Sequence, residues 1–66
     1  MNQNKKLLLY LMKNGHIEPV AALHKLGIYR LSARILDLRK AGHVIETKLV
    51  RRVRANVAKY ILRGTA

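Results

Sequence analysis

Residues 30–42 read RLSARILDLRKAG, and this stretch decides the fold. Leu31, Ile35 and Leu38 recur at spacings of four and three residues, which places all three on one face of an α-helix. Two cations and then a glycine end the stretch. This is a typical helix terminus, because cations interact favourably with the negative end of the helix dipole. The pattern therefore predicts a helix over residues 30–41 with an aliphatic buried face.

The other faces of this helix carry small, polar and basic groups. At 100° per residue, four side chains fall opposite the apolar face and two arginines flank it: Arg30, Ala33, Asp37 and Lys40, with Arg34 and Arg39 at the sides. Leu36 points away from the apolar face. We expect it to pack under the hairpin that follows, although a ligand or a dimer could also cover it.

Two helices are expected before this one. The first runs from Asn4 to Lys13, because four apolar side chains recur there at helical spacing and an Asn-Gly pair closes it: Leu7, Leu8, Leu11 and Met12. The second opens at Glu18-Pro19, where proline suits the first helical position, and ends at Leu26. We expect Val20 and Leu23 to face the core, and His16-Ile17 to be an extended link between the two helices.

The sequence after His43 changes from helical to strand periodicity. Val44–Val50 and Val57–Leu62 are rich in β-branched residues, which favours two strands. We expect a turn near Ala55-Asn56, because asparagine tolerates the left-handed conformation that turns use. The two strands and their turn predict a β-hairpin.

The charge of the chain is strongly one-sided. Fourteen Lys and Arg stand against three Asp and Glu in 66 residues, a formal net charge of +11, and ten of the fourteen lie between Arg30 and Arg63. Such a field opposes compaction but attracts polyanions, so it favours a nucleic-acid partner. With 50% apolar residues the chain is too hydrophobic for a disordered basic tail.

Length and composition exclude several classes. Sixty-six residues predict a single domain over residues 1–66, too small to build a catalytic cleft, so we expect no enzyme activity and no catalytic residue. There is no cysteine, and His16, His24 and His43 show no metal-ligand spacing, so we expect no metal and no cofactor. The apolar run of residues 7–12 is too short to span a membrane, and we expect no membrane partner.

Three helices followed by a hairpin is the order of a winged helix-turn-helix domain, an α+β and mainly α fold. In that arrangement the third helix enters the major groove of double-stranded DNA, and the hairpin, called the wing, lies on the backbone or the minor groove. The helix residues expected at DNA are Tyr29, Arg30, Ser32, Ala33, Arg34, Asp37 and Lys40. Those of the wing, residues 50–57, are Arg51, Arg52, Arg54 and Asn56. Lys5, Lys6 and Lys48 are expected to add backbone contacts.

Several of these assignments have a structural alternative. Arginine bonds guanine bidentately, but Arg34 could instead tie the helix to a carbonyl or to Glu46. Asp37 could accept a hydrogen bond from cytosine, but pairing with Arg34 or Lys40 is favoured. Tyr29 could bond phosphate or cap the core. Lys5 and Lys6 could form a merely solvated turn, and the wing arginines could simply protect a sheet edge.

The run from Gly27 to His43 resembles a family of small winged helix-turn-helix proteins found largely in bacteriophages and prophages. Ile45-Glu46-Thr47 and the strand from Val57 to Leu62 match that family too, whereas Glu18-Pro19 departs from the Ser or Thr that relatives often carry before the second helix. The resemblance spans Asn4 to Leu62. It implies a winged-helix DNA-binding domain of phage origin and says little about the biological role. From the charge map and the order of the elements we expect a transcriptional regulator or an excisionase-like accessory, in the bacterial cytoplasm at the nucleoid.

The alternative function is a phage protein-interaction module that binds a host protein. Leu36, Leu49, Val50 and Val53 could form its apolar patch. RNA binding is less favoured, because no aromatic stacking platform is evident. Since one small domain covers few base pairs, specific DNA recognition would need a homodimer, tandem binding or a partner protein.

Overall fold

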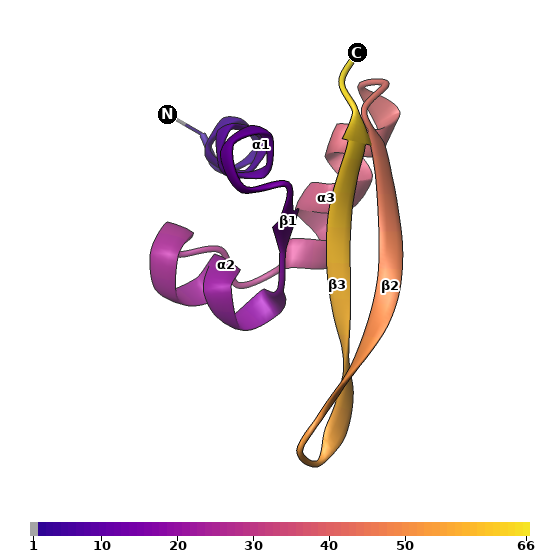
Figure 1. The fold of residues 1–66 in the computed structure, drawn as a ribbon. Coiled ribbons are helices and arrows are strands. Elements are labelled where there is room, and N and C mark those ends of the chain that lie inside the picture. The colour runs from indigo at the N-terminus through magenta and orange to yellow at the C-terminus, as the bar shows by residue number, and fades with distance from the viewer. Residues whose placement is uncertain (1) are drawn as a thin grey trace.

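A computed structural model describes residues 2–66. Three helices and three strands follow one another in the chain: α1 (Gln3–Asn14), β1 (His16–Ile17), α2 (Pro19–Leu26), α3 (Leu31–Lys40), β2 (Val44–Arg52) and β3 (Ala55–Gly64). The helices gather at one side of the β2–β3 hairpin, and the hairpin extends well past them (Figure 1). The predicted order of three helices and a hairpin is therefore present.

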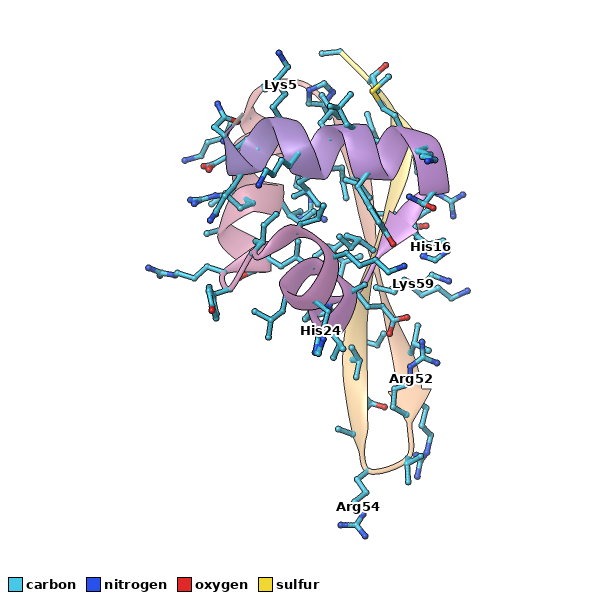
Figure 2. The ribbon with its side chains drawn as sticks, turned by 90° about the vertical axis from the view of Figure 1, so that its left-hand side faces the viewer. Lys5, His16, His24, Arg52, Arg54 and Lys59 are labelled. Atoms are coloured by element: carbon cyan, nitrogen blue, oxygen red, sulfur yellow. The ribbon has the colours of Figure 1, made fainter. Side chains whose placement is uncertain are left out.

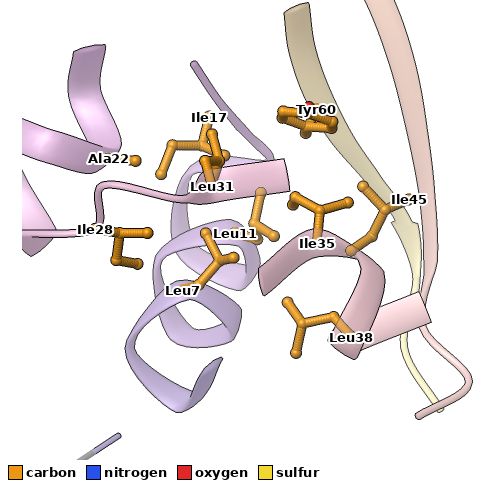
Figure 3. Packing of buried hydrophobic residues seen from close by; sticks show 10 residues of the cluster. All are labelled: Leu7, Leu11, Ile17, Ala22, Ile28, Leu31, Ile35, Leu38, Ile45 and Tyr60. Atoms are coloured by element: carbon orange, nitrogen blue, oxygen red, sulfur yellow. The ribbon is translucent and has the colours of Figure 1, made fainter. Parts of the chain in front are cut away.

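The core is aliphatic and lies between α1, α3 and the base of the hairpin (Figure 3). Its buried members are Leu7, Leu11, Ile17, Ala22, Ile28, Leu31, Ile35, Leu38, Ile45 and Tyr60. The three residues predicted to form the buried face of α3, Leu31, Ile35 and Leu38, are among them. Tyr60 is aromatic and the other members are aliphatic. Close packing of aliphatic side chains therefore stabilises this domain.

The inward faces of the first two helices differ from the prediction. Met12 is 59% exposed, because Leu7 and Leu11 already fill the inner face of α1. Val20 and Leu23 are 67% and 40% exposed, and Ala22 is the buried residue of α2. An eight-residue helix has about two turns, so the spacing of its apolar residues does not determine its inner face. α2 packs against α1 and β3 through the side that carries the small residue Ala22.

The ends of the helices follow their capping residues. The Asn2 side chain accepts a hydrogen bond from the Lys5 amide at the start of α1. Glu18 precedes α2 without a side-chain cap, and Pro19 follows it as expected. Gly42 has φ of 103°, which a residue with a Cβ rarely adopts, and it turns the chain from α3 into β2.

The sheet has one more strand than predicted. His16 and Ile17 are not a free link: they form β1, which pairs antiparallel with β3 opposite Ile61 and Tyr60. The strand order is β1-β3-β2, so β3 is central. Two residues are too few for a periodic signal, but their pairing buries Ile17 beside Tyr60 and joins the hairpin to the helical part.

The hairpin is longer than predicted, and its turn lies elsewhere. Arg52 pairs with Ala55, so the turn is Val53-Arg54 and not Ala55-Asn56. Asn56 is a strand residue opposite Arg51, and within residues 2–66 positive φ occurs at glycines alone. The expected left-handed asparagine is thus wrong, because cross-strand pairing continues two residues past the point where β-branched residues become sparse.

Candidate nucleic-acid interface

The solvent side of α3 is rotated from the prediction. Ser32, Leu36 and Lys40 are exposed, whereas Ala33 is partly buried. α1 packs against α3 and covers the side that carries Arg34 and Asp37. The outermost line of the helix therefore runs through Ser32, Leu36 and Lys40, four residues apart.

Arg34 and Asp37 form a local ion pair. Arg34 Nε donates to Asp37 Oδ2 at 3.0 Å, and the side-chain Nδ2 of Asn4, in α1, donates to the same oxygen at 3.3 Å. The favoured pairing of Asp37 is thereby confirmed. Both side chains are about two-thirds buried, so they fix α3 to α1 and are less available to a ligand than the outer line.

The start of α3 presents two long polar side chains to solvent. Arg30 occupies the N-cap position, one residue earlier than the helix proper, and is exposed. Tyr29 is 84% exposed, so its alternative role as a capping core residue is wrong. Ile28 fills that role instead at 1% exposure. Arg30 and Tyr29 thus project from the turn that leads into α3.

Arg39 has the structural role considered for Arg34. Its Nε and Nη2 donate to the Ile45 carbonyl at 3.0 and 2.7 Å, and Nη2 also donates to Thr47 Oγ1 at 2.7 Å. These bonds join the end of α3 to the first half of β2. A planar guanidinium can donate to both acceptors at once, which a lysine cannot do with the same geometry. Arg39 therefore fixes where the wing leaves the core.

Beyond that junction the wing contains no fully buried residue, although Ala58 packs against the edge of the core. From Glu46 to Lys59 no side chain is buried. Since Ile45 and Thr47 face α3, alternation places Arg51 on that same face of β2, opposite Asn56. Arg54 lies in the turn, at the far tip of the hairpin (Figure 2).

Arg52 differs from its neighbours because it is paired. Its Nη2 donates to Glu18 Oε2, which lies at the start of α2. This contact joins the wing to the helical part across 34 residues of chain. An arginine so engaged is a weaker candidate for phosphate than Arg51 or Arg54.

The three lysines predicted to contact the DNA backbone lie away from α3 and the wing tip. Lys5 is at the end of the molecule opposite Arg54 (Figure 2), and Lys6 follows it in the first turn of α1. Lys48 is directly opposite Lys59 in the hairpin, on the sheet face turned away from Ile45 and Thr47. The structure therefore places Lys5 and Lys6 away from the wing, and it places Lys48 in the hairpin on the face opposite Ile45 and Thr47.

Each acid of the described chain is bonded to an arginine. Besides the pairs of Asp37 and Glu18, Glu46 accepts from Arg63 Nε and Nη2 at 3.1 and 2.6 Å. This hydrogen bond, with the Arg63 charge, holds the pKa of the exposed Glu46 carboxyl below its ordinary value of 4.5. Eleven of the fourteen cations in residues 2–66 are consequently free of a carboxylate partner.

The predicted apolar patch does not form one surface. Leu36, Leu49 and Val53 are 50%, 68% and 98% exposed. Leu49 and Val50 are neighbours in β2, so their side chains point to opposite faces. Val53 stands alone at the hairpin tip between two arginines.

Two other features of the described chain concern sites of different kinds. Within residues 2–66 no group of three or more His, Asp or Glu side chains is placed to hold a metal ion. Over the same residues no helix is both long and apolar enough to cross a membrane.

Three helices, a short strand that pairs with the hairpin, and a long basic wing beside α3 define the winged helix-turn-helix class. A family model described as winged helix-turn-helix domain matches residues 2–64, and the chain belongs to that family. Domains of this class are typically non-enzymatic DNA-binding modules, so membership indicates DNA binding. No curated protein and no solved structure matches the chain.

Proposed function

We propose that this protein binds double-stranded DNA with α3 in the major groove and the wing, residues 50–57, on the backbone and minor groove. One observation carries the proposal: every acid of the described chain is engaged, while Arg30, Lys40, Arg51 and Arg54 remain exposed and free of carboxylates along α3 and the wing. Such cations release condensed counterions when they meet phosphates, which drives binding to DNA of any sequence.

The helix supplies the groups that would read bases. Ser32 and Lys40 lie on its outer line, and Arg30 projects from its N-terminal end. Arginine and lysine recognise guanine through O6 and N7, and the Leu36 side chain suits a thymine methyl group. The Arg34–Asp37 pair would hold α3 against α1, and it would be less available for contacts with bases than Ser32, Lys40 and Arg30.

The wing tip suits the minor groove. Val53 is almost fully exposed, and Arg54 follows it in the turn. Minor-groove proteins combine arginine contacts with apolar side chains inserted between base steps, so Arg54 would contact the groove and Val53 would be placed for insertion. Together with the resemblance to phage proteins, this supports a role as a transcriptional regulator or an excisionase-like accessory at the bacterial nucleoid, with dimers or tandem copies covering a full site.

Fluorescence anisotropy of a labelled random duplex of about 30 base pairs, titrated at several salt concentrations, tests the proposal. We expect log affinity to fall linearly with log salt, with a slope that corresponds to several phosphates. Absence of binding at 50 mM salt would remove DNA as the partner.

A further inference from the structure

The apolar run of α1 is larger than the core requires. Residues 7–12 are six consecutive apolar side chains and therefore surround the helix completely, at 100° per residue. The core takes Leu7 and Leu11 in full, while Leu9 is left 47% exposed. A leucine exposed on a highly charged domain calls for an explanation at the surface where it lies.

Leu9 lies in a groove between α1 and α2. The groove has a volume of about 520 Å³ and is lined by Lys6, Leu9, Tyr10, Lys13, Asn14, Lys25 and Leu26. Its floor is apolar, since Tyr10 and Leu26 pack against the core from below. This volume accommodates a few side chains, within the range of small binding sites.

The rim of the groove is basic. Lys6 and Lys13 come from α1, Lys25 comes from α2, and no acid lines the groove. The Lys25 ammonium lies 5.7 Å from the centre of the Tyr10 ring, a cation–π distance that positions this charge above the floor. The three acids of the described chain are bonded to arginines elsewhere.

We propose that this groove docks an acidic amphipathic helix of a partner protein. The apolar face of that helix would cover Leu9, Tyr10 and Leu26, and its carboxylates would pair with the rim lysines. A second copy of this chain does not fit, because it carries the same charge of +11. A phosphate backbone does not fit either, since it has no apolar face to cover the floor.

No residue that lines the groove belongs to α3 or to the wing, the proposed DNA surface. α1 and the wing tip lie at opposite ends of the molecule, as the positions of Lys5 and Arg54 show (Figure 2). A partner in the groove and a duplex at the wing can therefore be held at the same time, which would bring the partner protein to DNA. The inference does not depend on DNA binding, because its test uses peptides.

The experiment selects binders from a displayed library of random 16-residue peptides, followed by anisotropy with the enriched sequences as synthetic probes. We expect enriched peptides to combine Asp or Glu with apolar residues three and four positions apart. Their affinity should fall about tenfold or more in Leu9→Gln and in the double variant Lys13→Gln, Lys25→Gln. The charge-matched control, Lys48→Gln with Lys59→Gln on the sheet, should change it by less than about threefold. Circular dichroism and thermal melting verify that each variant is folded.

Four results would overturn the proposal. Enriched peptides could be acidic without an apolar spacing, or their binding could be equally sensitive to the control pair, and either would show attraction by net charge alone. No enrichment over the unselected library would show that the groove binds no peptide. Loss of duplex binding in the Lys13, Lys25 variant, larger than in the control, would assign the groove to DNA. If wild-type protein binds peptide but no duplex, the groove proposal stands and the DNA proposal fails.

Discussion

Replacing Arg51 and Arg54 together by glutamine should change how DNA binding responds to salt more than it changes the fold. Both side chains lie in the part of the hairpin that contains no buried residue, and neither is bonded to a carboxylate in the described chain. Each phosphate that a cation neutralises adds about 0.9 to the slope of log affinity against log salt, so losing two should flatten the slope by about 1.8. Between 50 and 200 mM salt, the wild type should then lose about twelvefold more affinity than the variant.

Glu18→Gln is the matched comparison. It frees Arg52 from its carboxylate partner, so the slope should steepen by up to about 0.9 if that arginine then meets a phosphate. Anisotropy with one labelled duplex measures all three proteins, and thermal melting verifies their folding. A double variant whose slope equals that of the wild type would refute the placement of the wing on DNA.

Three further predictions concern stability. Arg39→Ala removes the hydrogen bonds to β2 and should lower the free energy of unfolding by about 1–2 kcal/mol. In a thermal melt each kcal/mol lost should lower Tm by about 4–8 °C. An unchanged Tm would contradict the structural role of Arg39. Ile35→Ala should lower the free energy of unfolding, measured with denaturant, by about 2–5 kcal/mol, because Ile35 is buried. Leu36→Ala, at the exposed neighbouring position, should change it by less than about 0.5 kcal/mol. Similar losses in both variants would contradict the orientation of α3. The pKa of the Glu46 carboxyl, followed by NMR, should lie below 4.5 and should rise in Arg63→Gln. Because this pKa is depressed in the folded state, the ion pair stabilises the fold above pH 4.5, and the stabilisation is lost as the pH falls through the folded pKa. Identical titrations of Glu46 in both proteins would contradict the Glu46–Arg63 pair.

The helices and the hairpin are predictable because their signals are repeated along the chain. The stripe of α3 contains three residues at helical spacing, and all three are buried. By contrast, the strand His16–Ile17 has no period of its own and forms through the hydrogen bonds that β3 supplies from more than 40 residues away. Its detection requires the sheet, which local sequence does not contain.

The candidate site is predictable in composition and less so in detail. Basic residues on α3 and the wing are visible from charge alone. The engagement of Arg52 with Glu18 is not, because it joins residues 34 apart through the fold. That Arg39 and not Arg34 bonds to β2 depends on how α3 is rotated by its packing on α1, a contact between elements that periodicity does not specify.

The length of the hairpin beyond the core has a consequence for how this domain can diversify. From Arg51 to Asn56 every side chain is exposed, so a substitution there removes no core packing and its cost to folding is small. Selection can therefore alter the tip, lengthen it or exchange its arginines while Ile45 and Tyr60 continue to hold its base in the core. Sequence variation among related chains should accumulate in this segment, separating the evolution of target preference from that of stability.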